Sequence, residues 1–479
     1  MQPDSNLKPL FDSEIQAIAH YVKHDTIQSS LANDTAKLCL LDSLGCALLA
    51  LNYPECTKLL GPVVPNANLT LGARVPGTSF ELDPVQAAFN IGTMIRWLDY
   101  NDTWLAQEWG HPSDNLGGIL AVADYLSRQA GHKKHRVIFM QDILTAMIKA
   151  YEIQGILALE NSFNRIGIDH VVLVKVATTA VVAELLGLTE EQICAAVSQA
   201  FVDGQSLRTY RHAPNTGWRK SWAAGDATAR GVRLAWLTAL GEEGYPSALS
   251  AKRWGLYDVL FQGKPFKCQR PYGSYVMENI LFKIAYPAEF HAQTAIECAV
   301  ALHPETIERL DQIDKIIVRT QEAAMRILNK KGPLHNPADR DHSLQYMIAM
   351  GLVHGVLTSD YYQDKFSSDF RIDKLRDKMQ VSEDLEFSRD YLNPEKRAIS
   401  NALQIFFNDG TFTKEIKIEY PVGHKQRRSE GIPLLKQKFY NNLRSRFSKE
   451  KSDRLFLFCD DQTSLAEMPV HEFMELWIE

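Results

Sequence analysis

The stretch WLDYNDTW (residues 97–104), followed closely by HPSDN (residues 111–115), lies where one helical pattern ends and another begins. It places carboxylates, a hydroxyl and an imidazole in a short polar loop between two helices. Helix ends can hold such a loop in a fixed position, and the first N–H groups of the second helix are free to bind an anion. The stretch therefore predicts a helical fold with a polar site between helix ends. The simpler alternative is that Asp99 and His111 only cap the two helices.

Helical patterns extend from this loop in both directions. Residues 34–51 keep leucines at helical spacing, and Asp83-Pro84 is typical of an N-cap followed by proline at the first helical position. A further helix is expected over residues 116–129. In residues 187–192 (GLTEEQ) a helix stop precedes a capping box, which predicts two antiparallel helices. Residues 1–273 therefore predict an all-helical domain.

The pattern changes after Pro271-Tyr272-Gly273. Residues 315–320 alternate like a strand, and two apolar runs flank Asn408-Asp409-Gly410, which is a strong hairpin signal. A helical pattern over residues 343–352 lies between them. The predicted class is mainly α with an α+β part, namely a large all-helical domain plus a smaller α/β lid domain containing an antiparallel sheet. The expected boundaries are 1–273 for the first part of the helical domain, 274–424 for the α/β lid, and 425–479 for C-terminal helices that return to the helical domain.

Composition excludes several classes of function. The formal net charge is −6 and no long basic run occurs, so we expect no nucleic acid partner. The first residues do not form a secretory signal, and no apolar run is long enough to cross a bilayer, so we expect a cytoplasmic protein without a membrane partner. Seven cysteines are scattered without a CxxC pair. Their spacing argues against a disulfide framework, a zinc site and an iron–sulfur cluster, so no metal and no cofactor are expected.

The common motifs of nucleotide, nicotinamide, zinc-protease and serine-hydrolase sites are absent from the sequence. What remains is a set of separated polar clusters, each of which alone is explained as helix capping or a solvated surface. Taken together they suit a polycarboxylate, because imidazoles can act as general base and acid while ammonium and guanidinium groups neutralise carboxylates. The clusters are Asp99, Asp102, Thr103 and His111; Glu160 to Arg165 with Asp169 and His170; Arg208 to His212 with Arg219 and Lys220; Lys283 with Glu289 and His291; and Asp339 to His342 with Tyr346.

At these clusters the chain resembles, over essentially its whole length, a family of iron–sulfur-independent enzymes. The family comprises 2-methylcitrate dehydratase, cis-aconitate decarboxylase and iminodisuccinate epimerase. The stretches that carry the resemblance are RWLDYNDTW (96–104), LAQEWGHPSDNLGG (105–118), ENSFNRIGIDHV (160–171), LRTYRHAPNTG (207–217), KIAYPAEFH (283–291) and NPADRDHSLQYM (336–347).

The resemblance implies an active site between a helical domain and an α/β lid, and the dehydration of 2-methylcitrate in the methylcitrate cycle of propionate breakdown. The expected substrate is a small tricarboxylate, and the expected state is a monomer or homodimer. His170 or Asp99 would remove a proton next to a carboxylate, and His111 would protonate the departing hydroxyl. The substrate carboxylates would be bound by Lys220, Lys283 and Arg208, with further substrate contacts from Thr103, His291 and Tyr346.

Two alternatives stay open at this point. The same pocket could decarboxylate cis-aconitate or dehydrate citrate, since these reactions use similar groups. The chain could also be a helical binding scaffold without catalysis. A scaffold predicts polar clusters that are exposed and unrelated in space, whereas catalysis predicts that they converge on one cleft.

Overall fold

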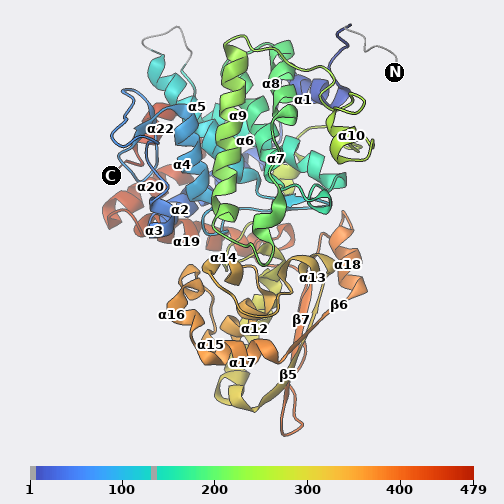
Figure 1. Cartoon of the computed structure of the whole chain (residues 1–479). Coiled ribbons are helices and arrows are strands. Elements are labelled where there is room, and N and C mark those ends of the chain that lie inside the picture. Colours follow the sequence, from blue (N-terminus) through green and yellow to red (C-terminus); the bar gives the residue numbers. More distant parts are fainter. Residues whose placement is uncertain (1–6, 131–136, 479) are drawn as a thin grey trace.

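The computed structural model describes residues 7–130 and 137–478, which form two large hydrophobic cores. Figure 1 shows a helical part above a smaller α/β part (residues 290–418). The helical part contains α1 (Ser13–His24), α2 (Ser30–Ala50), α3 (Pro54–Thr57), α4 (Pro84–Arg96), α5 (Leu116–Gln129), α6 (Met140–Glu160), α7 (Val171–Leu185), α8 (Glu190–Val202), α9 (Arg219–Ala239), α10 (Leu256–Leu260) and α11 (Tyr275–Asn279), with the short strands β1 (Ala73–Arg74), β2 (Glu81–Leu82), β3 (Trp104–Leu105) and β4 (Trp109–Gly110).

Capping side chains fix the residues at which the predicted helices begin. The Asp83 side chain accepts hydrogen bonds from the N–H groups of Val85 and Gln86 at 3.0 and 3.1 Å, so α4 begins at Pro84 as expected. The second helix of the opening stretch, α5, covers the predicted residues 116–129. The stop at Gly187 and the capping box at Thr189 also form as predicted.

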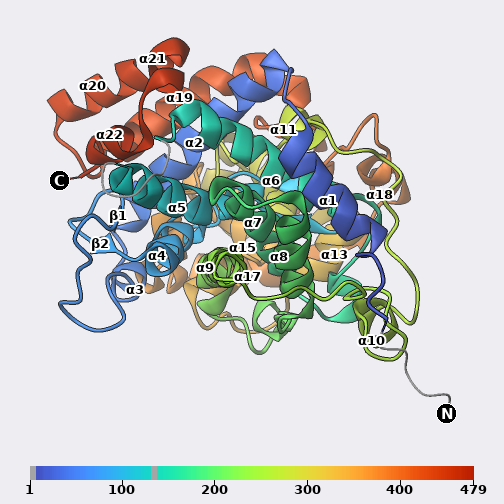
Figure 2. The ribbon, with the colours of Figure 1, turned by 90° about the horizontal axis from the view of Figure 1, so that it is seen from above.

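Helix α7 is the centre of the helical part. Figure 2 shows it surrounded by α5, α6, α8 and α9, and each of these helices contacts it. Residues 171–183 are all buried, which is typical of a helix that is apolar on every side. Because the packing holds α7 on all sides, its first turn is a rigid support for the residue that precedes it, His170.

Helices α4 and α9 approach each other closely at Gly92 and Gly225. A Cβ atom on Gly92 would lie 2.9 Å from the Cα of Gly225, and a Cβ on Gly225 would lie 2.5 Å from the carbonyl oxygen of Phe89. Only glycine leaves room for this contact. The crossing also brings the loop after α4, which carries Asp99, near the first turn of α9, which carries Lys220.

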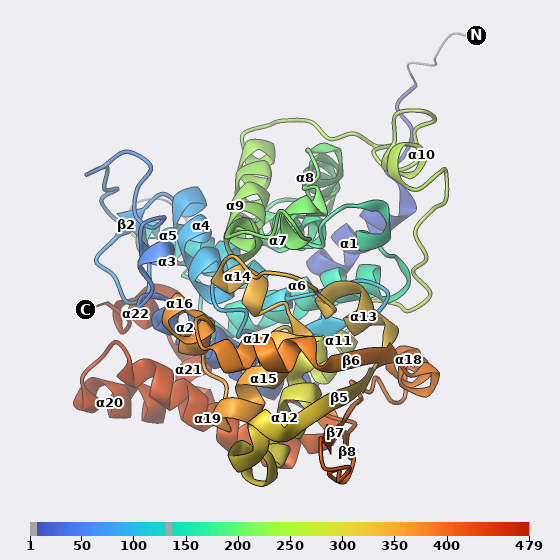
Figure 3. The same ribbon diagram turned by 60° about the horizontal axis from the view of Figure 1, so that its bottom comes forward.

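The α/β part has a four-stranded sheet in the order β6-β5-β7-β8 (Figure 3). Its elements are α12 (Gln293–Thr306), β5 (Ile313–Thr320), α13 (Glu322–Leu328), α14 (Pro337–Arg340), α15 (Leu344–His354), α16 (Asp364–Ser367), α17 (Phe370–Asp377), β6 (Met379–Glu383), α18 (Leu385–Leu392), β7 (Asn401–Phe407) and β8 (Ile416–Ile418).

Two of the three strand pairs in the sheet are antiparallel, as predicted, and the third pair is parallel. β7 pairs antiparallel with β8 across the turn at Asn408-Asp409-Gly410, and β5 pairs antiparallel with β7. Strand β6, however, runs parallel to β5. The chain reaches it through several helices, and a helical crossover of this kind joins parallel strands. The class predicted from the sequence, mainly α with a small α/β part, is confirmed.

The C-terminal helices pack on the beginning of the chain. They are α19 (Arg428–Arg444), α20 (Lys449–Asp460), α21 (Gln462–Glu467) and α22 (Val470–Glu475). Figure 1 shows α19 beside α2, and α22 contacts α5. Phe439 and Trp477 are buried in the same core as the first helices. Among the described helices, none has the length and apolar character needed to cross a membrane.

We expect Gly225→Ala to destabilise the protein although alanine favours a helix. The new methyl group would press on the Phe89 carbonyl and force α4 and α9 apart, which costs about 1–3 kcal/mol. Urea unfolding followed by circular dichroism measures the change. Arg233→Ala, at an exposed position of the same helix, is the control and should unfold near the wild-type midpoint. A wild-type midpoint for Gly225→Ala would contradict the packing argument.

Candidate active site

A buried group of charged side chains, with Asp99 at its centre, lies where the helical part meets the α/β part. Asp99 is 1% exposed; its Oδ1 lies 2.8 Å from Nη1 of Arg96 and forms an ion pair with Lys283. Burial alone would raise the pKa of Asp99, but Arg96 and Lys283 outweigh it and hold that pKa well below its usual range. Its backbone has a φ of 50°, a left-handed conformation that aspartate tolerates better than most residues. Asp99 is therefore a fixed, ionised carboxylate.

A short backbone pairing brings Lys283 to Asp99 from far along the chain. Thr103 N donates to the carbonyl of Leu281 at 2.8 Å, and Leu281 N donates to the carbonyl of Thr103 at 3.0 Å. Two residues later, Lys283 Nζ also donates to the Asp99 carbonyl at 2.8 Å. The loop of the opening stretch is thus held against the segment that follows α11.

His111 is oriented by its own loop. Its Nδ1 lies 2.7 Å from the carbonyl oxygen of Asp102, to which it donates, and 3.3 Å from Oγ1 of Thr103. This contact leaves Nε2 on the side of Asp99, 3.7 Å from Oδ1. Burial, with Arg96 and Lys283 nearby, lowers the pKa of His111 well below its usual value, so the imidazole is neutral.

His170, at the N-terminus of α7, faces His111. The two ring centroids lie 5.8 Å apart. Nδ1 of His170 lies 3.4 Å from Oδ1 of Asp169 and 3.5 Å from Nη1 of Arg208, while its buried Nε2 has no hydrogen-bond partner among the described residues. Burial lowers the pKa of His170 well below its usual value, and the Arg208 and Arg211 guanidiniums add to this effect.

A second backbone pairing brings these arginines to His170. Arg208 N donates to the carbonyl of Gly167, and Asp169 N donates to the carbonyl of Ser206, both at 2.9 Å. Arg211 then forms an ion pair with Asp169, and Nη1 of Arg208 lies 3.7 Å from the same carboxylate. The arginines of the segment after α8 therefore reach the N-terminus of α7.

The α/β part completes the group with Asp341 and His342, between α14 and α15. Nζ of Lys220 lies 2.6 Å from Oδ2 of Asp341, and Nδ1 of His342 lies 2.7 Å from Oδ1 of Asp341. His342 Nε2 lies 4.0 Å from Oδ2 of Asp99. Burial, together with Lys220, lowers the pKa of His342 to about 4. Lys220 and Asp341 thus join the two parts of the chain by a buried ion pair.

Two of the predicted site residues lie at the edge of this group. Nδ1 of His291 lies 2.8 Å from Oε1 of Glu289, whose backbone N–H donates to the Asp341 carbonyl. Tyr346 uses its hydroxyl to donate to the carbonyl of Tyr361 at 2.6 Å, within the core of the α/β part. The other predicted residues belong to the group, and Lys220 is joined to it through Asp341 and His342. They are Asp99, Thr103, His111, His170, Arg208, Lys220 and Lys283.

Sequence analysis did not select four residues that the structure brings into the group. Arg96 lies three residues before Asp99, a spacing that places both on one side of a helix end and could have indicated the pair. Arg211, Asp341 and His342 lie in polar clusters noted in the sequence, but their partners are distant in the chain. No local spacing identifies such partners.

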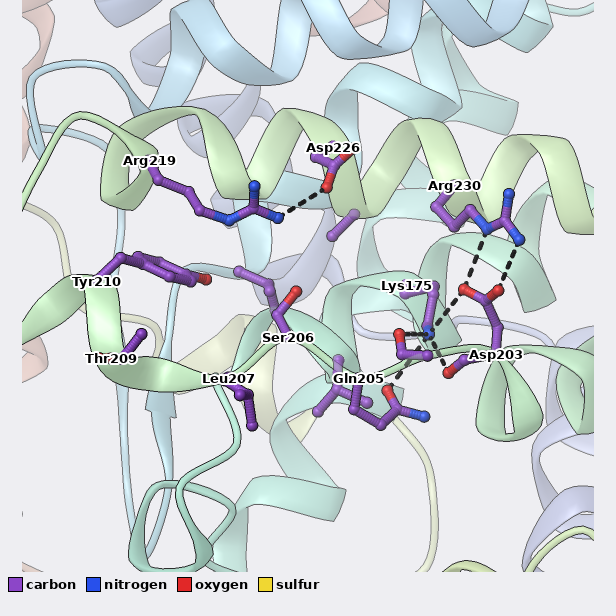
Figure 4. A pocket seen from close by; sticks show the side chains of 14 residues that line it. Lys175, Asp203, Gln205, Ser206, Leu207, Thr209, Tyr210, Arg219, Asp226 and Arg230 are labelled. Carbon is purple, nitrogen blue, oxygen red and sulfur yellow. Dashed lines mark hydrogen bonds and ion pairs between the residues drawn. The ribbon is translucent and has the colours of Figure 1, made fainter.

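A separate pocket is lined by residues of α7, of α9 and of the segment that joins α8 to α9 (Figure 4). It has a volume of about 600 Å³ and is lined in part by residues 203–207. Its charged side chains bind one another: Asp203 pairs with Lys175 and Arg230, and Arg219 pairs with Asp226. By contrast, the buried Asp99 Oδ2 and His170 Nε2 find no hydrogen-bond partner in the described part of the chain. These unpaired atoms favour the charged group between the two parts as the candidate active site.

Comparison with known proteins covers almost the entire chain. Residues 16–269 match the MmgE/PrpD N-terminal domain, and residues 286–461 match the MmgE/PrpD C-terminal domain. The chain is 59% identical over 477 residues to 2-methylcitrate dehydratase of Escherichia coli (strain K12), covering 99% of each. It is 59% identical to 2-methylcitrate dehydratase of Cupriavidus necator, covering 98% of each. It is also 57% identical to the mitochondrial 2-methylcitrate dehydratase of Yarrowia lipolytica, covering 99% of this chain and 92% of that protein.

We expect His342→Asn to reduce the loss of stability in weak acid. Folding keeps the imidazole neutral down to about pH 4, whereas the unfolded chain binds the proton below about pH 6.5, so the free energy of unfolding falls between these values. Asparagine keeps a donor for Asp341 but binds no proton. Urea unfolding between pH 7 and pH 4.5 measures the slope. The exposed His335→Asn should keep the wild-type slope, and an equal slope in His342→Asn would refute the buried neutral imidazole.

Proposed function

The chain belongs to the MmgE/PrpD family, and on this basis we propose that it is a hydro-lyase that removes water from 2-methylcitrate to form 2-methyl-cis-aconitate. The observation that carries the proposal is the identity of 59% to 2-methylcitrate dehydratases over the full length of both chains. The charged group between the two parts supports it, because imidazoles and cations converge there as this reaction requires. The polar clusters are buried together, which a non-catalytic scaffold does not predict.

The reaction needs a base, an acid and fixed positive charge. Removing a proton from the carbon next to a carboxylate places negative charge on that carboxylate, and cations arranged in advance stabilise it. The departing hydroxyl group needs a proton. Lys220, Lys283 and Arg208 are buried cations at the site, and a trianionic substrate offers them carboxylates to bind.

His170 is the better of the two candidate bases. Asp99 is held by Arg96 and Lys283, which keep its pKa low, and a carboxylate stabilised in this way accepts a proton poorly. His170 is neutral, and in the tautomer that carries its proton on Nδ1, 3.4 Å from Oδ1 of Asp169, it presents the unpartnered Nε2 as an acceptor. We therefore assign proton removal to Nε2 of His170.

His111 suits the role of the acid. Its Nδ1 donates to the Asp102 carbonyl, so a proton held on Nε2 is the one available to the departing hydroxyl. The negative charge of the substrate raises the pKa of a neighbouring imidazole, and Asp99 at 3.7 Å stabilises the imidazolium. Thr103, in contact with His111, would orient a carboxylate. His291 and Tyr346 at the edge of the site stay predicted substrate contacts.

The domain organisation of the chain is a further part of the proposal. We propose the predicted order of a helical part, an α/β part and C-terminal helices that return to the first, with the α/β part at 290–418 in place of the predicted 274–424. Val276, Met277 and Val422 pack in the first core, as the C-terminal helices do, which supports these narrower bounds. The cytoplasmic location and the monomeric or homodimeric state stay predictions. The absence of a metal and of a cofactor is also still a prediction.

A product assay tests the substrate. We expect the purified protein to convert 2-methylcitrate to 2-methyl-cis-aconitate with a higher kcat/KM than it shows for citrate, and to release no carbon dioxide from cis-aconitate. Ultraviolet absorbance of the double bond and chromatography of the products measure these three reactions together. Preferential decarboxylation of cis-aconitate would replace the proposal with the decarboxylase alternative, and no reaction with any of the three would favour the scaffold.

We expect His170→Asn to lower kcat about 10²- to 10⁴-fold, because the variant lacks the base that accepts the substrate proton. Circular dichroism and the melting temperature should show that the fold persists. His212→Asn, a histidine at an exposed position of the same neighbourhood, is the matched control and should keep wild-type turnover. Near-normal turnover by His170→Asn would assign proton removal to another group.

A further inference from the structure

The hydroxyl group of Tyr362 is a polar atom that the fold leaves unused. Tyr362 is 5% exposed, and its hydroxyl has no hydrogen-bond partner among the described residues. Buried tyrosine hydroxyls normally find a partner, because an unpaired buried donor costs free energy. An orphan hydroxyl in a native core therefore needs an explanation.

Tyr362 lies within electrostatic range of the candidate active site. It ends the 3₁₀ turn η6 (Ser359–Tyr362), which follows α15. Burial raises the pKa of Tyr362 well above its usual value, and the carboxylates of Asp341 and Asp99 raise it further. The hydroxyl consequently keeps its proton at any working pH. It is a permanent hydrogen-bond donor close to the two carboxylates that organise the site.

The α/β part holds Tyr362 in place through its neighbours. Nη1 of Arg340, next to Asp341 in the chain, donates to the Tyr362 carbonyl at 2.6 Å. The ring of Tyr346 stacks on that of Tyr362 with centroids 6.2 Å apart, and its hydroxyl donates to the carbonyl of Tyr361. The predicted contact residue Tyr346 thus supports the tyrosine whose hydroxyl is free.

The helical part holds the same turn from the other side. The hydroxyl of Tyr53, between α2 and α3, lies 2.6 Å from Oγ of Ser359 and 3.1 Å from Oδ1 of Asp360. The turn is therefore fixed where the two parts meet, and the position of Tyr362 at its end is fixed with it. A donor held in this way is preorganised for an acceptor that arrives with a ligand.

We propose that the Tyr362 hydroxyl donates a hydrogen bond to a carboxylate of the tricarboxylate substrate. This inference rests on the proposed function and adds a substrate-binding residue to that site. A group that cannot lose its proton matches an acceptor, and a carboxylate is the strongest acceptor that the substrate offers. The bond forms when substrate occupies the site between the parts, so it contributes to binding rather than to proton transfer.

The alternative is that Tyr362 only fills the core of the α/β part. The two explanations give different results for Tyr362→Phe, which removes the hydroxyl and keeps the ring. Deleting an unpaired buried hydroxyl leaves stability unchanged or raises it. If the hydroxyl binds substrate, the same variant loses activity. Unchanged or higher stability combined with lower activity is a result that a purely structural role does not produce.

We expect Tyr362→Phe to lower kcat/KM for 2-methylcitrate about 10- to 100-fold, mainly through KM, as the loss of a hydrogen bond to a charged group predicts. Tyr361→Phe is the matched control, since Tyr361 lies in the same turn as Tyr362 and its ring packs against His354 and Phe366. The control should retain wild-type kinetics. Wild-type kcat/KM in Tyr362→Phe would overturn the proposal.

Binding of propane-1,2,3-tricarboxylate, which has three carboxylates and no hydroxyl, identifies the acceptor. Isothermal titration calorimetry should show Kd weakened about 10- to 100-fold in Tyr362→Phe and unchanged in Tyr361→Phe. Equal Kd values for Tyr362→Phe and wild type would overturn the assignment to a carboxylate, even if turnover falls.

The binding experiment also separates this inference from the proposed function. If the wild type binds the tricarboxylate but does not dehydrate 2-methylcitrate, the proposed reaction fails, and the Kd values of the variants still decide the role of Tyr362. If the wild type binds no tricarboxylate, the role of Tyr362 fails as well.

Discussion

The ion pairs that Asp99 forms with Arg96 and Lys283 are the interaction on which the rest of the site depends. Taking these charges out of water is costly, and only close pairing compensates for it. Removing one partner would leave a buried charge unpaired, so each charge requires the others. The pairing contributes less to net stability than to geometry. It fixes the loop after α4 against the segment after α11, and the orientation of His111 follows from that loop.

The same constraint assigns chemical roles. A carboxylate that holds two cations stays ionised and cannot act as an effective base. In the proposed mechanism Asp99 therefore organises charge, while a neutral imidazole would take the proton. His111, His170 and His342 are all kept neutral by burial and by neighbouring cations. In the proposed mechanism a bound trianion opposes this effect at His111, because negative charge favours the protonated imidazole that the acid requires. On this proposal, substrate binding changes the protonation state that His111 prefers.

The site depends on both parts of the chain. Two short backbone pairings, Thr103 with Leu281 and Ile168 with Leu207, attach distant segments to the helix ends. Lys220 and Asp341 then join the helical part to the α/β part, and Tyr53 holds the turn that presents Tyr362. A substrate between the parts would contact groups from both, and displacement of either part would separate them.

The sequence by itself determined what short-range physical chemistry controls. Asp83-Pro84 and the Thr189 capping box start their helices because a cap binds backbone groups within a few residues. The turn at Asn408-Asp409-Gly410 likewise joins neighbouring strands. The sequence motifs, with the family resemblance, also indicated most of the residues that the structure brings into the buried charged group.

Only the tertiary structure decided which of these residues meet. Lys283 lies 184 positions from Asp99 and Lys220 lies 121 positions from Asp341, and no local spacing encodes such pairs. Three other features were decided in the same way: the parallel placement of β6, the hydrogen bond of the Tyr346 hydroxyl within the core, and the Tyr362 hydroxyl that has no partner among the residues the structure describes. Each depends on how helices and strands pack after they form, and packing is a property of the whole chain.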